Sequence, residues 1–127
     1  MINCDLLVKK AYEGRANAYT PYSNFKVGAA VLTEDDTIYT GCNIENASYG
    51  ATNCAERTAI FKAISEGHQK IKAIAIVGVE NDYTYPCGIC RQVIVEFATK
   101  DIKNHLRQKS YRIYCKNYGR NLTRCFH

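Results

Sequence analysis

Apolar and polar positions repeat with two periods before residue 100. Helical spacing of apolar residues predicts helices over residues 3–18, 54–66 and 86–98. Alternating or continuous apolar runs predict strands over residues 25–32, 37–43 and 71–79. The order of these elements predicts a layered α/β domain with a partly parallel sheet.

Residues with known helix-end and turn preferences mark the boundaries. Asn3 is a suitable N-cap for the first helix, and Pro21 stops that helix because the residue before proline avoids helical geometry. Gly67 is a natural end for the second helix. Residues 33–36 form a polar turn between the first two strands, and beyond Lys100 neither period continues.

Composition places the chain among ordinary globular domains. It has 127 residues, of which 46% are hydrophobic and 23% charged, so we expect one domain over residues 1–127. The longest apolar run, at residues 73–77, is far below the roughly 20 residues that span a membrane. Charged side chains within residues 1–20 do not fit a signal peptide, so we expect a cytoplasmic protein.

The formal net charge of +5 is unevenly distributed. Residues 1–99 hold nine Lys and Arg against eleven Asp and Glu, a balance of −2. Residues 100–127 hold eight basic residues against one acid, a balance of +7. The basic character therefore belongs to residues 100–127, and residues 1–99 have no excess of positive charge that would attract phosphate groups.

Cysteine usage points to a metal. An odd count of seven without a signal sequence argues against a secreted disulfide framework. Cys87 and Cys90 lie one helical turn apart, and Cys54 begins another predicted helix. If both helices start from one edge of the sheet, three thiolates can bind zinc and leave a fourth position open, as in catalytic sites. Helix N-termini favour the thiolate form.

Glu56 lies two residues after Cys54 and can act as a general acid–base beside that position. Plainer interpretations remain open. The Cys-x-x-Cys pair could be redox-active or half of a structural zinc site completed by Cys42 or His68. Glu56 could cap its helix opposite Asn53. Taken together, however, Cys-Ala-Glu followed by Pro-Cys-x-x-Cys matches the signature of zinc-dependent deaminases.

The sequence resembles the small, homotetrameric cytidine deaminases from about residue 5 to residue 100. Four segments carry this resemblance: Tyr22-Ser23-Asn24-Phe25-Lys26-Val27-Gly28-Ala29-Ala30, Gly41-Cys42-Asn43-Ile44-Glu45-Asn46-Ala47-Ser48-Tyr49-Gly50, Cys54-Ala55-Glu56-Arg57-Thr58-Ala59 and Pro86-Cys87-Gly88-Ile89-Cys90-Arg91-Gln92-Val93.

The resemblance implies a zinc-dependent hydrolase of pyrimidine salvage that converts cytidine and deoxycytidine to uridine and deoxyuridine with release of ammonia. It also implies a three-layer α/β/α fold with a mixed five-stranded sheet. The expected assembly is a homotetramer with shared active sites, and the expected substrate is a small nucleoside. Neither a membrane nor a nucleic acid is expected as a partner. Each subunit would bind one Zn²⁺.

The resemblance also assigns roles to individual residues. Cys54, Cys87 and Cys90 would be the zinc ligands, and Glu56 would transfer protons. Substrate contacts would come from six residues: Phe25 on the pyrimidine, Asn43 and Glu45 on the ribose hydroxyls, the Ala55 backbone on the base, and Ala47 and Tyr49 toward a neighbouring subunit's site. Arg57 can donate hydrogen bonds to the thiolates, because three sulfurs and a hydroxide leave zinc with excess negative charge.

Two other functions fit parts of the sequence. A deaminase of a related aminated nucleoside, a nucleotide or a polynucleotide would share the zinc motif, although such polynucleotide enzymes usually place His where Cys54 stands. A non-catalytic zinc-binding module with a basic, nucleic-acid-binding tail would share the cysteines and explain the charge. That module would need a fourth protein ligand.

Residues 104–127 depart from the family, so the last strand and C-terminal helix are in doubt. Relatives end in a motif like Glu-Leu-Leu-Pro-x-x-Phe, which this tail lacks. Reading permitted codons one nucleotide later turns residues 120–126 into Glu-Ile-Leu-Pro-Asp-Ala-Phe and restores apolar patterning. We therefore expect a one-nucleotide frame change near Lys103-Asn104, in the gene or in its reading; the alternative is a divergent basic arm.

Overall fold

The computed structural model describes residues 2–78, 87–99, 113–118 and 121–126. Within them, the helices are α1 (Cys4–Arg15), α2 (Ala55–Ser65) and α3 (Gly88–Phe97), with a short 3₁₀ turn η1 (Tyr49–Ala51). The strands are β1 (Gly28–Thr33), β2 (Ile38–Cys42), β3 (Ile71–Val77), β4 (Ile113–Tyr118) and β5 (Asn121–Phe126). The rest of the atypical tail, residues 104–112, 119–120 and 127, lies outside the described residues. No helix in the described ranges is long and apolar enough to cross a membrane.

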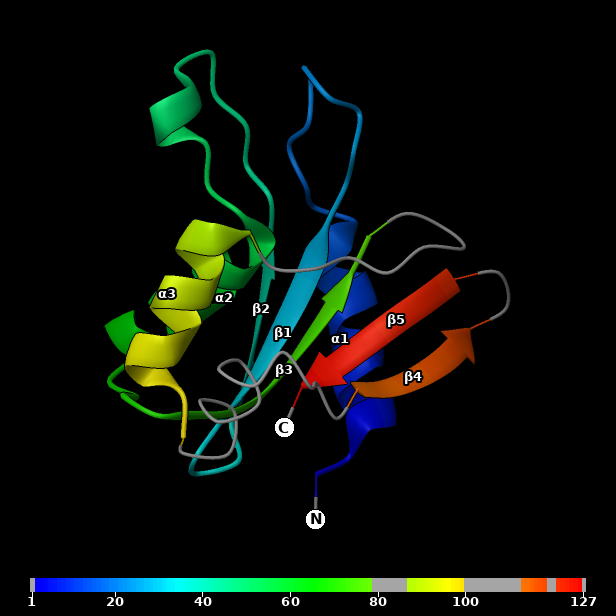
Figure 1. Ribbon diagram of the computed structural model, residues 1–127, viewed down its shortest axis with the longest axis vertical. Helices are drawn as coiled ribbons and strands as arrows, with labels where there is room; N and C mark the ends of the chain where they lie inside the picture. The colour runs from blue at the N-terminus through cyan, green and yellow to red at the C-terminus, as the bar shows by residue number, and fades with distance from the viewer. Residues whose placement is uncertain (1, 79–86, 100–112, 119–120, 127) are drawn as a thin grey trace.

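The sheet is antiparallel in every described ladder. Its strands lie in the order β2-β1-β3-β5-β4, and β1 pairs with both β2 and β3. The expectation of a partly parallel, mixed sheet is therefore wrong for these ladders. The crossover through α2 does bring β3 back in the direction of β2, but it inserts β3 beside β1, so the two parallel strands never pair (Figure 1).

The apolar pattern predicted neither of the two C-terminal strands, and only the family resemblance implied a five-stranded sheet. β5 pairs with β3, placing the backbone of Ala75 opposite Cys125, and β4 pairs with β5. Residues 113–118 show no alternation of apolar and polar positions. Their strand geometry follows from the backbone ladder they form, which a pattern of side chains does not reveal.

Helices cover both faces of the sheet, as expected for an α/β/α arrangement. Helix α1 packs on one face and helices α2 and α3 on the other (Figure 1). Strand β3 separates these layers by alternation. Ile74 and Ile76 belong to the cluster beneath α2 and α3, whereas Ala73 and Ala75 belong to the cluster beneath α1.

Local signals place the helix ends. The Asn3 side chain accepts a hydrogen bond from the Leu6 N–H at 3.1 Å, which confirms the predicted N-cap. Gly67 adopts a φ of +99° after α2, a conformation that favours glycine, and so confirms the predicted stop. Helix α1 ends at Arg15, before the predicted residue 18, because the Ala18 N–H already bonds in a turn to Arg15 O.

Strand β2 approaches helix α2 unusually closely at Gly41. A Cβ placed on Gly41 would lie 2.4 Å from Ala59 N and 2.5 Å from Ala55 O. On its other side, the Gly41 carbonyl oxygen would lie 2.8 Å from a Cβ on Gly14 of α1. The absence of side chains at these two glycines lets both helices approach one strand, and this fixes where α2 begins.

Substitution of Gly41 by alanine should therefore destabilise the protein. The added methyl group would meet backbone atoms of α2 that cannot rotate away, and overpacking of this kind costs about 1–3 kcal/mol. Denaturant unfolding would measure the change in the free energy of unfolding. Gly50→Ala is the matched control, because a Cβ there meets nothing within 4 Å. Equal unfolding midpoints for the two variants would contradict the close approach.

Candidate metal centre and active site

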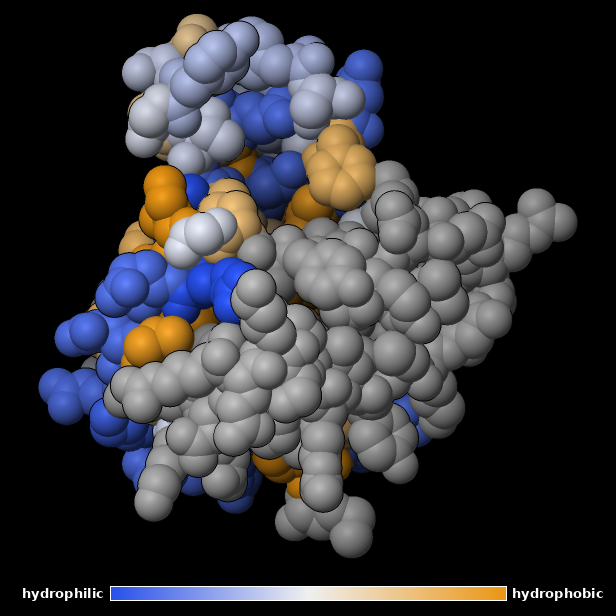
Figure 2. Space-filling view, viewed as in Figure 1, coloured by the Kyte–Doolittle hydropathy of each residue, from blue (hydrophilic) through white to orange (hydrophobic). Residues whose placement is uncertain are grey.

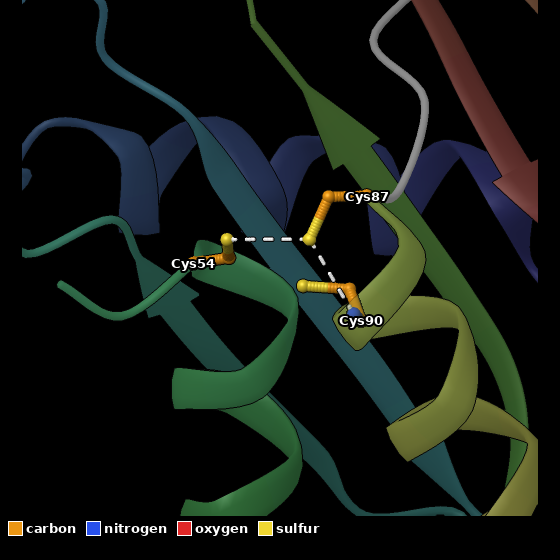
Figure 3. A group of neighbouring side chains, drawn as sticks. All are labelled: Cys54, Cys87 and Cys90. Carbon is orange, nitrogen blue, oxygen red and sulfur yellow. Dashed lines mark hydrogen bonds between the residues drawn. The ribbon is translucent and has the colours of Figure 1, made fainter. Parts of the chain in front are cut away.

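Three thiols converge where α2 and α3 begin. Their sulfur atoms all lie within 4.8 Å of one another, and Cys54 Sγ is 3.8 Å from Cys87 Sγ. Figure 3 shows the three side chains directed into one space between the two helices. Two ligands of a tetrahedral zinc ion at about 2.3 Å stand about 3.8 Å apart. The cluster therefore has the donor type and the spacing of a zinc site.

The backbone of the helix ends sets the positions of these thiols. Cys54 is the N-cap of α2 and Cys87 is the N-cap of α3. The Cys90 N–H donates to Cys87 Sγ at 3.4 Å, so one ligand sulfur also satisfies an otherwise unpaired helix-end donor. Cys90 lies one turn further along α3 and is buried, whereas Cys87 is exposed and Cys54 half-buried. The site is therefore open to solvent on the Cys87 side.

Hydrogen bonding shifts the pKa values of two of these thiols, Cys54 and Cys90, in opposite directions. The pKa of the Cys54 thiol is lowered to about 5, mainly by hydrogen bonding with the Cys90 thiol and also by Arg57. The same interaction, together with burial and the charge of Glu56, raises the pKa of Cys90. The opposite shifts in pKa favour the thiolate form at Cys54 and the neutral thiol at Cys90. Binding a cation would release the proton that Cys90 retains.

Arg57 contacts this cluster directly. Its Nη2 donates to Cys54 Sγ at 3.4 Å, and the interaction raises the pKa of the guanidinium. Its Nε is buried and, among the described residues, has no hydrogen-bond partner. A buried, unused donor beside sulfur atoms fits a residue that compensates the charge of a thiolate site.

Glu56 is buried at the start of α2, with 4% of its surface exposed. Burial is the main cause that raises the pKa of its carboxyl group, and hydrogen bonding with the Cys90 thiol opposes that rise. The alternative in which Glu56 caps its helix opposite Asn53 finds no support, because the N-cap residue of α2 is Cys54 and, among the described residues, no side-chain hydrogen bond caps this helix. A buried carboxyl group beside a thiol cluster can accept and return a proton.

The proposed fourth protein ligands lie outside this cluster. Within the described ranges, the metal-ligating group comprises only the three cysteines. The Cys42 backbone carbonyl accepts from Thr58, and burial raises the pKa of the Cys42 thiol. His68 Nδ1 is 2.9 Å from Asp35 Oδ1, at the hairpin turn. Neither residue therefore supplies a fourth ligand to the cluster in the part of the chain that the structure describes.

Five of the six expected substrate residues lie on two loops, residues 16–27 and 43–54, and the sixth, Ala55, is the first residue of α2. Both loops project from the end of the sheet at which α2 and α3 begin (Figure 1), and they form the pale lobe at the top of Figure 2. Phe25 is 37% exposed and Tyr49 is 88% exposed, so both rings remain available for contact. Ala47 is exposed beside Tyr49, and Ala55 is buried in the first turn of α2.

Asn43 and Glu45 hold backbone groups of the first loop. The Asn43 amide bonds to Phe25 and Val27, and the Glu45 carboxylate bonds to Tyr22 and Ser23. Glu45 also lines a hollow of about 190 Å³ with Tyr22, Asn46, Tyr49 and Thr52. A larger hollow of about 410 Å³ is lined by residues 34, 35 and 67–70, none of which was expected in the site.

Thr58 is a positioning residue that the sequence analysis quoted without a role. Its hydroxyl accepts from Asn53 Nδ2 at 3.0 Å and lies 2.9 Å from the carbonyl oxygen of Cys42. It thereby ties the first turn of α2 to the end of β2. Its signal in the sequence is its position four residues after Cys54, on the same helix face.

Comparisons with known proteins agree with this geometry. The model of the cytidine and deoxycytidylate deaminase zinc-binding region matches residues 1–106. A cytidine deaminase of Halalkalibacterium halodurans is 54% identical over 101 residues, which cover 80% of this chain and 76% of that protein. One from Sporosarcina psychrophila is 50% identical over 105 residues, covering 83% and 77%.

Solved structures show the same likeness. The crystal structure of cytidine deaminase from Burkholderia pseudomallei is 50% identical, has a TM-score of 0.72, and matches over 76% of this chain and 77% of that one. That of cytidine deaminase from Mycobacterium leprae is 43% identical with a TM-score of 0.73, over 77% and 82%. The chain therefore belongs to the zinc-binding cytidine and deoxycytidylate deaminase family.

Proposed function

We propose that this chain catalyses the hydrolytic deamination of cytidine and deoxycytidine to uridine and deoxyuridine, with release of ammonia. The observation that carries the proposal is the convergence of three thiols, all within 4.8 Å, beside the buried carboxyl group of Glu56. Relatives that are 50–54% identical are named cytidine deaminase. A role in pyrimidine salvage follows from this reaction.

Cys54, Cys87 and Cys90 would hold one Zn²⁺ per chain, and the donor spacing fits that ion. When bound, zinc supplies a Lewis acid that lowers the pKa of water toward about 7. Arg57 offsets the negative charge of the thiolates from its position beside Cys54 Sγ. The exposed flank at Cys87 leaves room for substrate to approach.

Glu56 would carry the protons of the reaction. Its carboxylate accepts a proton from the attacking water and delivers it to N3 of the pyrimidine, which makes C4 more electrophilic. It then helps protonate the departing amino group. Because burial raises its pKa, the carboxyl group binds and releases a proton more evenly near neutral pH than an exposed glutamate does.

Substrate would be held by the two loops and by a neighbouring subunit. Phe25 would stack on the base, the Ala55 backbone would contact it, and Asn43 and Glu45 would bind the ribose hydroxyls. Ala47 and Tyr49 would reach a neighbouring subunit's site in a homotetramer. The strong exposure of Tyr49 supports this placement, because a ring so exposed in one chain gains most from a partner. A reducing cytoplasm would keep the three ligand thiols free.

The tail stands apart from the family match, which ends at residue 106. We propose that residues 104–127 result from a one-nucleotide frame change near Lys103-Asn104. We also propose that residues 1–127, with this atypical tail included, form a single three-layer domain with a five-stranded sheet. The shifted reading supplies an ending that resembles the family's. Sequencing the coding DNA decides between this origin and a divergent arm: codons that cannot encode Glu-Ile-Leu-Pro-Asp-Ala-Phe in the next frame contradict it.

Replacing Glu56 by alanine should abolish most turnover without releasing zinc. Positioned proton transfer contributes about 10²–10⁴-fold to a rate, so ammonia release from cytidine should fall at least that far. Zinc content, measured on the same sample, should not change. Glu66→Ala, an exposed glutamate at the end of the same helix, is the control and should keep normal activity. Near-normal turnover of the Glu56 variant would refute its role.

Loss of one ligand thiol should remove the metal. Wild-type protein dialysed against a mild chelator should retain one zinc per chain, whereas Cys90→Ser should retain far less, because the site would lose one of its three protein donors. Metal analysis by mass spectrometry measures both. Cys42→Ser changes a half-buried thiol outside the cluster and should leave the zinc content unchanged. Zinc loss on this control would instead indicate a four-cysteine structural site.

Free nucleosides should be better substrates than phosphorylated or polymeric ones. Residues 1–99 carry a balance of −2, and the Glu45 carboxylate lines the hollow between the loops, so phosphate groups find little attraction there. Ammonia release should be compared for cytidine, its 5′-monophosphate and a short cytosine-containing oligonucleotide. Preference for the oligonucleotide would favour the polynucleotide alternative, and absence of turnover on all three would favour the non-catalytic zinc module.

A further inference from the structure

The loop that carries Phe25 has little regular structure of its own. Residues 20–27, here called the Phe25 loop, connect the end of the first helical region to β1 and include Asn24 at a φ of +56°. A left-handed residue and an exposed ring need external support to keep one geometry. That support comes from the segment that follows β2.

Asn43 binds the C-terminal half of the Phe25 loop through both Oδ1 and Nδ2 of its side-chain amide. Its Oδ1 accepts from the Val27 N–H at 2.9 Å, and its Nδ2 donates to the Phe25 carbonyl oxygen at 2.8 Å. Its backbone N–H also donates to Val27 O at 3.2 Å. The ring of Phe25 is therefore attached to a backbone that Asn43 holds on both sides.

The Glu45 carboxylate binds the N-terminal half of the Phe25 loop. Its Oε1 accepts from the backbone N–H groups of Tyr22 and Ser23, at 3.0 and 3.1 Å. Hydrogen bonds from Ser23 are the leading cause that lowers the pKa of this carboxyl group. The Ser23 hydroxyl in turn accepts from the Phe25 N–H at 3.0 Å, so the contact extends to Phe25 itself.

The same segment is joined to the metal centre through the backbone. Ile44 and Asn53 exchange two hydrogen bonds of 2.9 Å, and Asn53 directly precedes Cys54. The Phe25 loop, the Asn43–Glu45 segment and the start of α2 therefore form one hydrogen-bonded unit. A shift of either side chain would be transmitted to the ring of Phe25 without passing through substrate.

We propose that Asn43 and Glu45 are positioning residues for Phe25, a role that is separate from any contact with the ribose. The proposal rests on the function proposed above. The two backbone N–H groups of Tyr22 and Ser23 both donate to Oε1 of Glu45, and Glu45 also lines the hollow of about 190 Å³. One carboxylate thus links the sugar side of the site to the loop that carries the stacking ring, and discrimination of sugar and base depends on the same bonds.

A substrate that lacks the 2′- and 3′-hydroxyl groups separates positioning of Phe25 from binding of those two hydroxyls. Glu45→Ala should lower kcat/KM on cytidine, and it should also lower it on 2′,3′-dideoxycytidine by about tenfold, since bonds to a charged acceptor are lost in both cases. Glu45→Gln keeps an oxygen that can accept from both N–H groups and should recover part of the loss on dideoxycytidine. A loss confined to cytidine would overturn the proposal.

A second measurement does not depend on activity. The chain contains no tryptophan, so Phe25→Trp introduces a single fluorescent reporter on the loop. Adding Asn43→Ala or Glu45→Ala to that variant should increase acrylamide quenching of the tryptophan about twofold or more, because the loop loses its anchors. Adding Glu66→Ala is the matched control and should leave quenching unchanged. Unchanged quenching in both anchor variants would overturn the inference even if cytidine is turned over. Lack of turnover in the wild type would count against the proposed function alone.

Discussion

The contact between the first turn of α2 and the end of β2 is the constraint on which the site depends. Gly41 carries no side chain, so the backbone of α2 at Ala55 and Ala59 lies directly against the strand. Thr58 then ties the same turn to the Cys42 carbonyl group. Because the helix cannot slide along the strand, Cys54 and Glu56 are fixed relative to the sheet, and α3 brings the other two thiols to them.

The chemistry of the site follows from two helix N-termini meeting at one point. Partial positive charge at each helix start favours thiolates, and Arg57 adds a full positive charge beside Cys54. Glu56 is buried in the same turn, so its carboxyl group binds a proton more readily than an exposed one. A cluster that attracts a cation thus lies next to a group suited to move protons, in a chain that belongs to a zinc-binding deaminase family.

Most residues proposed to contact substrate lie on loops instead of on the sheet, and side chains of neighbouring segments hold these loops. The amide of Asn43 and the carboxylate of Glu45 replace the regular backbone ladder that strands would provide. Such loops can present an exposed aromatic ring without burying it in the core. The family match covers these loops and ends at residue 106, so most of the basic tail lies outside it.

The sequence by itself determined the three helices, the first three strands and the Cys87–Cys90 pair as candidate metal ligands, because periodicity and the Cys-x-x-Cys spacing act within a few residues. Helix caps such as Asn3 and the stop at Gly67 are local in the same way. Tertiary structure alone decided the remaining features. Strand β3 pairs antiparallel with β1, and β5 pairs with β3. The Asn43 side-chain amide hydrogen-bonds to the backbone of the Phe25 loop. Each of these is a choice among distant partners, and side-chain patterns do not record which backbone groups a segment will meet.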